Sequence, residues 1–142
     1  MADGLARNMA STILGIVMVY AGYLHFHSPE PFIKIMPSAL PYKSELVSLS
    51  GFFEVLGGLG LIIPLTRRVA AAGLIALYIT VFPANVNMAV HHIPIDGVHY
   101  PPPVLWLRLP FQLLFICWAY WCANFGKRAG VQHGKVAHAL KS

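Results

Sequence analysis

Four long apolar segments, separated by short polar or proline-rich stretches, dominate the pattern along the chain. They cover residues 8–26, 45–63, 69–90 and 104–125. Each is close to the ~20 residues with which an α-helix crosses a hydrocarbon core ~30 Å thick. Apolar and polar residues do not alternate along them, and backbone groups in lipid must be paired within the segment, so we expect helices. The pattern predicts an all-α fold, a four-transmembrane-helix bundle.

Composition supports one membrane domain spanning residues 1–142. Hydrophobic residues make up 57% of the chain and charged residues 11%, which leaves more apolar surface than a soluble domain of this length can bury. A soluble all-α domain would need charged helix faces, and the long uncharged runs do not provide them. We therefore expect an integral, multi-pass membrane protein, in the bacterial inner membrane if the source is prokaryotic.

The basic residues predict the orientation of the bundle. Arg7, the Arg67-Arg68 turn and a basic tail over residues 126–142 fall on one side of a four-span topology, while Lys34 and Lys43 lie in a loop on the other side. Because basic loops stay in the cytoplasm, both termini are expected to be cytoplasmic. This bias and attraction to anionic headgroups account for the net charge of +5, so we expect no nucleic-acid partner.

The first outer loop, residues 28–44, is unusually apolar for a connection between helices. It contains four prolines and the apolar residues Phe32, Ile35 and Met36. Such a segment is expected to lie across the membrane surface as a short amphipathic piece that covers the outer mouth of the bundle.

Glu54 is the most informative single residue of the second segment. It lies about nine residues, or ~14 Å, below the outer end of its helix. A carboxyl group at this depth must be protonated, ion-paired or bound to a metal. Ser50, Gly57 and Gly58 share its helix face, which indicates a close-packed seam that contains an acid. A purely structural ion pair is the alternative interpretation.

Two further segments supply polar groups at the same depth or above it. His25 shares a face with Gly22 and Ala21, so we expect it to point inward, although a histidine at the membrane interface is the alternative. In the third segment, Asn87 and His91 lie on one helix face. Asn85, Met88 and His92 form the neighbouring stripe, which a kink at Pro83 would aim at the bundle axis.

In the fourth segment, Arg108 and Gln112 are one helical turn apart. A guanidinium near the membrane boundary needs a partner, and Glu54 on another helix is the expected one. Asn85 and Gln112 would then satisfy the remaining donors and acceptors.

Five short motifs occur in order along nearly the whole chain: Gly22-Tyr-Leu-His25-Phe26, Ser50-Gly51 with Glu54, the glycine-rich seam that ends at Pro64, Phe82-Pro83-Ala84-Asn85 with Met88, and Arg108-Leu-Pro110-Phe-Gln112. As a set they resemble the small DoxX-like membrane proteins. The resemblance implies a four-helix membrane bundle. The family takes its name from a partner of a terminal quinol oxidase and of thiosulfate:quinone oxidoreduction. Related members resemble accessory proteins, a receptor-assembly chaperone and, more distantly, an anthrone oxygenase. The positions that the resemblance carries over, without any catalytic role, are His25, Glu54, Asn85, Arg108 and Gln112.

Two classes of function fit these residues. In the first, the protein is a redox-associated membrane subunit or a quinone-linked oxidoreductase or oxygenase. Glu54 and His25 are its candidate catalytic residues and exchange protons. The candidate substrate-binding residues, which would hold carbonyl or oxyanion groups, are Asn85, Asn87, Arg108 and Gln112. The cofactor would be a quinone or a Cu, Fe or Zn ion, and the metal variant of the site would use His25, Glu54, His91 and His92.

In the second class, the polar cluster is a buried network that sets helix register. The chain is then a non-catalytic accessory, scaffold or chaperone subunit. In both classes the expected partners are the lipid bilayer and either further copies of the chain or the subunits of a larger membrane complex.

Overall fold

The computed structural model describes residues 2–94 and 97–123. Its helices are α1 (Ala2–His27), α2 (Glu30–Ile35), α3 (Lys43–Ile62), α4 (Arg67–His91) and α5 (Pro102–Ala123). Four of them, α1, α3, α4 and α5, are long and apolar enough to cross a membrane. The prediction of an all-helical, four-span chain is therefore confirmed for the residues that the structure describes.

The helix boundaries agree with the predicted ones to within two residues, except at the start of α1. That helix begins at Ala2 rather than at residue 8, and tertiary contacts hold it near the predicted start. Arg67 Nη1 on α4 donates to Asn8 Oδ1 at 2.9 Å, and the guanidinium of Arg7 lies 5.6 Å from the ring centroid of Trp121 on α5. The predicted basic tail, residues 126–142, lies outside the described residues.

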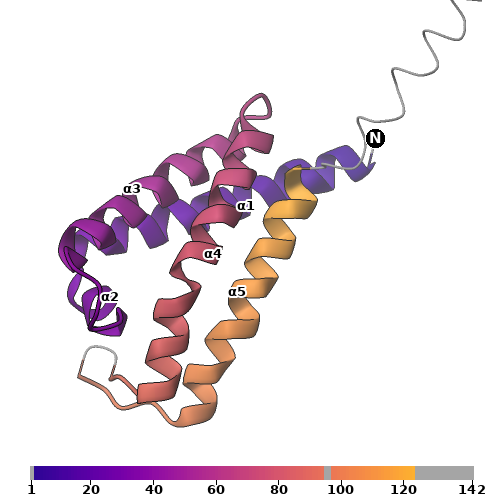
Figure 1. The fold of residues 1–142 in the computed structure, drawn as a ribbon. Helices are drawn as coiled ribbons and strands as arrows, with labels where there is room; N and C mark the ends of the chain where they lie inside the picture. The colour runs from indigo at the N-terminus through magenta and orange to yellow at the C-terminus, as the bar shows by residue number, and fades with distance from the viewer. Residues whose placement is uncertain (1, 95–96, 124–142) are drawn as a thin grey trace, which may run out of the picture.

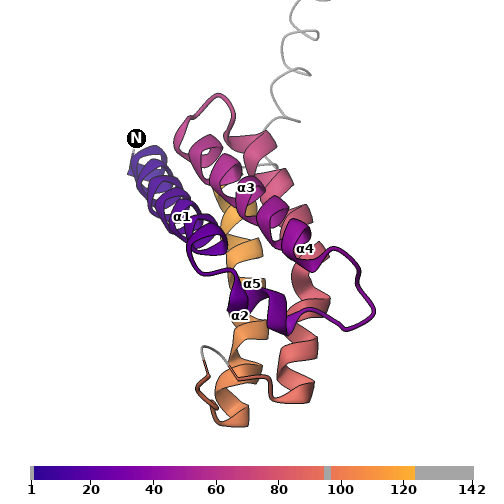
Figure 2. The ribbon, with the colours of Figure 1, turned by 90° about the vertical axis from the view of Figure 1, so that its left-hand side faces the viewer.

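The four long helices form two antiparallel pairs, α1 with α3 and α4 with α5 (Figure 1). The pairs meet at the end that holds the start of α1 and the turn between α3 and α4, and they diverge toward the other end. The short helix α2 lies between the diverging ends (Figure 2), in contact with α3 and α4. The segment over residues 28–44, for which a short amphipathic cover was predicted, thus contains a short helix that lines the space between the pairs.

Glycines set the close approach of α1 and α3. A Cβ atom added to Gly22 would lie 2.6 Å from the carbonyl oxygen of Gly51, and one added to Gly15 would lie 2.6 Å from that of Gly58. Any larger side chain at these points would push the backbones apart, which is the role of small residues at membrane helix interfaces. Within the predicted seam, Gly58 therefore packs on α1, whereas a Cβ atom added to Gly57 would lie 2.6 Å from Leu74 on α4.

Two clusters of buried apolar side chains stabilise the fold. The larger one joins the four long helices where the pairs meet and contains Leu14, Met18, Leu61, Ala71, Leu74, Tyr78, Ala119, Cys122 and Ala123. The smaller one fastens α2 to α4 and α5 through Ile35, Met88, Ala89 and Leu105. Between these clusters, the divergence of the pairs leaves a cavity.

Candidate functional site

The cavity has a volume of about 1050 Å³ and is lined by all five helices together with the segment that follows α2. This volume is at the upper end of the range for small-molecule sites, which are concave and mostly apolar with a few placed polar groups. The lining follows that pattern. Among many apolar side chains, its polar members are His25, Ser50, Glu54, Tyr78, Thr80, Asn85, Arg108 and Gln112. Both candidate catalytic residues and three of the four candidate binding residues therefore face one space.

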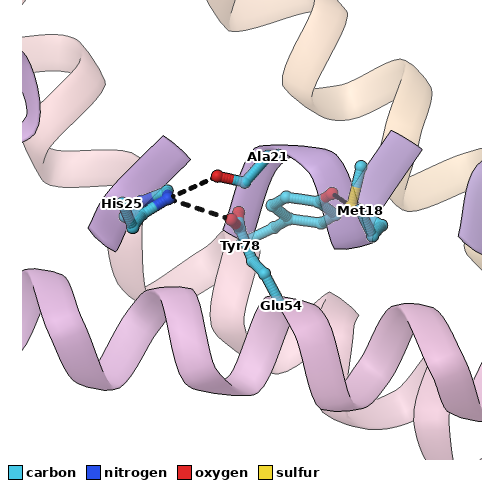
Figure 3. A network of polar contacts seen from close by, with 5 residues as sticks. All are labelled: Met18, Ala21, His25, Glu54 and Tyr78. Atoms are coloured by element: carbon cyan, nitrogen blue, oxygen red, sulfur yellow. Dashed lines mark hydrogen bonds and ion pairs between the residues drawn. The ribbon is translucent and has the colours of Figure 1, made fainter. Parts of the chain in front are cut away.

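His25 and Glu54 form a close pair on the wall made by α1 and α3 (Figure 3). Their Nδ1 and Oε2 atoms are 3.2 Å apart, and the residues are only 8% and 7% exposed. The same Nδ1 atom lies 2.9 Å from the backbone oxygen of Ala21. One ring N–H cannot donate well to both oxygens, and Glu54 Oε2 is indeed buried without a hydrogen-bond partner. The pair is thus in electrostatic contact, and the carboxyl oxygen that faces the imidazole is buried.

Two neighbours hold the His25 side chain in place. A Cβ atom on Gly51 would lie 2.6 Å from His25 Cβ, so the glycine permits the contact between α1 and α3 at this point. On the cavity side, the Phe32 ring from α2 stacks on the imidazole, with centroids 3.8 Å apart and planes inclined by 22°. The sequence predicted that Phe32 covers the bundle mouth but not that it contacts His25. Periodicity along one helix does not reveal its contacts with a segment from elsewhere in the chain.

On the wall made by α4 and α5, the carboxamides bind one another. Asn85 Nδ2 donates to Gln112 Oε1 at 2.7 Å, and Gln112 Nε2 donates to the backbone oxygen of Tyr78. The Tyr78 hydroxyl in turn points at the Met18 sulfur (Figure 3). This network joins α4 to α5 and α4 to α1, and it satisfies polar groups that would be costly to leave unpaired in an apolar interior.

The predicted ion pair between Glu54 and Arg108 is wrong. In the described part of the chain, no guanidinium nitrogen of Arg108 lies within 4.0 Å of a Glu54 carboxyl oxygen. The Glu54 carboxyl faces His25 instead. Arg108 Nη1 instead donates to Met88 Sδ at 3.2 Å. The physical reason is the divergence of the helix pairs, which puts the carboxyl and the guanidinium on different walls of the cavity.

Asn87 was predicted to bind substrate, and the structure gives it another contact. Its Nδ2 atom donates to the backbone oxygen of Ile35 at 2.9 Å, which fastens α2 to α4. Asn87 is not among the residues that line the cavity. Asn87 is two residues after Asn85, and each helical residue turns by about 100°, so the two side chains point in nearly opposite directions.

The predicted metal set is not assembled. Both His91 and His92 are exposed, with His91 Nδ1 lying 3.0 Å from the Asn87 backbone oxygen and His92 ending α4 in a left-handed conformation at φ 50°. Among residues 2–94 and 97–123, no three His, Cys, Asp or Glu side chains gather in a way that could hold a metal ion. Only His25 and Glu54, of the four proposed ligands, lie together.

The apolar helices and the cavity between them are those of a multi-pass helical membrane protein. The chain belongs to the family described as a domain of unknown function, DUF8561, whose model matches residues 14–123. The match contains His25, Glu54, Asn85, Arg108 and Gln112 and therefore both walls of the cavity. No curated protein and no solved structure matches the chain.

Proposed function

We propose that this chain is a DoxX-like, redox-associated membrane subunit that binds a small oxygen-bearing molecule of the quinone class in the cavity. The observation that carries the proposal is the gathering of His25, Glu54, Asn85, Arg108 and Gln112 around one largely apolar space. An apolar body fits such a lining, while a few polar groups orient the oxygen atoms.

His25 and Glu54 are the proton-exchanging pair of this proposal. Reduction of a quinone to a quinol consumes two electrons and two protons, and oxidation releases them. The electrons pass to or from a redox partner in the same membrane complex, and the buried pair moves protons at the ligand oxygen. The contact of 3.2 Å between His25 Nδ1 and Glu54 Oε2 supports this role, because the two ionisable groups of one cavity wall are close enough to pass a proton between them.

The orientation belongs to the proposal as well. Arg7, Arg67 and Arg68 lie at the end where the helix pairs meet. With this basic end in the cytoplasm, both termini are cytoplasmic and the cavity opens in the outer half of the membrane.

The test is binding of a short-chain benzoquinone to the purified protein in lipid nanodiscs, followed by tryptophan fluorescence. We expect saturable binding. Glu54→Gln should weaken it roughly tenfold, because the loss of one hydrogen bond to a charged or polar group changes affinity by about this factor. Glu45→Gln is the matched control, since Glu45 is exposed on the first turn of the same helix. Absence of saturable binding, or equal effects of the two substitutions, would overturn the proposal.

A second candidate function is a non-catalytic scaffold, and the network of Asn85, Gln112 and Tyr78 favours it. These groups bind one another and so are suited to setting helix register. A double variant with His25→Phe and Glu54→Gln separates the two functions. If it assembles with its native partner complex and supports that complex's activity unchanged, the cavity pair is dispensable and the scaffold is the function.

A further inference from the structure

Arg108 is a charged group on the cavity wall, and its hydrogen-bond acceptor in the protein is a weak one. Its Nη1 atom donates to the sulfur of Met88 at 3.2 Å, and a thioether is a poor acceptor. Arginine has five donors in a fixed fork and keeps its charge in proteins. The Arg108 side chain is exposed in the described chain, so most of this fork is open to a ligand.

Among the described residues, the guanidinium of Arg108 has no carboxylate beside it. Glu54, on the other wall of the cavity, lies 3.2 Å from His25 instead. Arg108 carries one positive charge, and in the described part of the chain no carboxylate lies within 4.0 Å of it. A single cation against a largely apolar lining is costly unless an anion joins it.

The neighbouring amides do not supply the missing acceptor. Gln112 Oε1 accepts from Asn85, and Gln112 donates to the Tyr78 backbone. Across residues 2–94 and 97–123, the hydrogen bond of Arg108 goes to Met88 and to neither amide. The wall formed by α4 and α5 therefore presents a guanidinium whose protein acceptor is a sulfur atom, beside two amides that bind each other.

We infer that the ligand is a monoanionic amphiphile whose carboxylate or enolate head binds Arg108 while its apolar body fills the cavity. This goes beyond the proposed function: it places a ligand in the same cavity but gives it a charged head that a quinone lacks. A planar two-oxygen head matches the fork of the guanidinium and can accept two hydrogen bonds from it. The apolar body has room beside α2 and the residue that follows it, since Phe32, Ile35 and Met36 line the cavity.

The experiment compares two ligands that share an apolar chain and differ in head charge, dodecanoate and dodecanol. Both are titrated into the full chain in nanodiscs of uncharged phosphatidylcholine, at a pH where dodecanoate is ionised. We expect dodecanoate to bind roughly tenfold or more tightly than dodecanol, the usual size of a charge-assisted contact. Equal affinity of the two in the unaltered protein would overturn the inference.

Variants then locate the preference. Arg108→Gln should lower the affinity for dodecanoate to that for dodecanol and leave dodecanol binding unchanged, whereas Arg108→Lys should keep part of the preference. Lys34→Gln is the matched control, since it removes one charge from the exposed face of α2, and it should preserve the preference. A preference that survives Arg108→Gln, or that Lys34→Gln abolishes equally, would contradict the assignment. Thermal unfolding of each variant verifies the fold.

A third titration, with the neutral short-chain benzoquinone, separates this inference from the proposed function. If the benzoquinone binds saturably and dodecanoate does not displace it, the anionic head is wrong and the proposed function stands. If dodecanoate binds through Arg108 and the benzoquinone does not bind, the anionic head stands and the quinone class is wrong. If none of the three ligands binds, both are wrong.

Discussion

The two helix pairs that enclose the cavity differ in how they pack and in what they bury. α1 and α3 approach so closely that a Cβ atom on Gly22 or Gly51 would meet the other helix within 2.9 Å, and this pair holds the buried His25 and Glu54. α4 and α5 each contain an internal proline and are joined by amide hydrogen bonds. The ionisable pair thus occurs where two helices are in close contact. Arg108, which has no carboxylate within 4.0 Å among the described residues, lies on the wall joined by amide hydrogen bonds.

The comparison teaches that close packing and polar satisfaction are separate ways to position a functional group in a membrane. On the first wall, glycines bring two ionisable groups together. On the second, neutral amides hold the helices in register and leave the guanidinium of Arg108 available. Four sets of substitutions test this difference, in order of decreasing expected effect.

Gly51→Ala should lower the free energy of unfolding by about 3 kcal/mol, the upper range for overpacking a tight contact. The new methyl group would lie 2.6 Å from His25 Cβ and 2.9 Å from the Gly22 backbone oxygen, and backbone cannot move aside as a flexible side chain can. Thermal unfolding in detergent measures the loss. Gly73→Ala is the control, because nothing lies within 4 Å of its added Cβ and alanine favours helix by roughly 0.5–1 kcal/mol. Similar destabilisation by both would refute the close contact.

Gln112→Leu should lower stability by about 2 kcal/mol, because it leaves the Asn85 amide and the Tyr78 carbonyl without their partner. The double variant with Asn85→Leu should recover part of this loss, since one orphaned group is removed. Thermal unfolding of both variants provides the measurement. A double variant whose loss equals the sum of the single losses would show that the two amides are independent.

His25 and Glu54 should be energetically coupled by about 1 kcal/mol in a double-mutant cycle with His25→Phe and Glu54→Gln, since groups in contact do not add. Glu54→Gln and Arg108→Met should instead add to within about 0.5 kcal/mol, because the structure places them apart. Unfolding in detergent supplies both cycles. Coupling in the second cycle and none in the first would reverse the pairing described here.

Asn87→Ala should loosen α2 with the smallest effect on global stability, about 1 kcal/mol for one hydrogen bond. The lost bond is the one from Asn87 Nδ2 to the Ile35 carbonyl. A spin label on a cysteine at Met36, in a chain with Cys117→Ala and Cys122→Ala, should become more mobile. His91→Ala is the control, because His91 is exposed and does not contact the cavity. Equal mobility of the label in the parent chain, the Asn87→Ala variant and the His91→Ala variant would mean that Asn87 does not hold α2.

Much of the candidate site could be predicted from single residues. An acid such as Glu54 deep in an apolar helix needs a partner within the protein, whichever helix lies beside it. The small residues Ala21 and Gly22 on the same helix face as His25 predict that the His25 side chain points inward. The partners could not be predicted, because periodicity defines a face but not the helix opposite it. For the same reason His91 and His92 were expected at the bundle axis, although they emerge at the end of α4.

The four long apolar helices, their boundaries to within two residues apart from the start of α1, and the polar positions that need internal partners could all be predicted from the amino-acid sequence. These features follow from local physics: hydrocarbon thickness, backbone pairing and the cost of burying charge. The divergence of the helix pairs, the contact of Phe32 with His25 and the separation of Arg108 from Glu54 became known from the three-dimensional structure. Those outcomes depend on contacts between distant residues, such as the glycine crossings of α1 and α3, whose geometry no single helix contains.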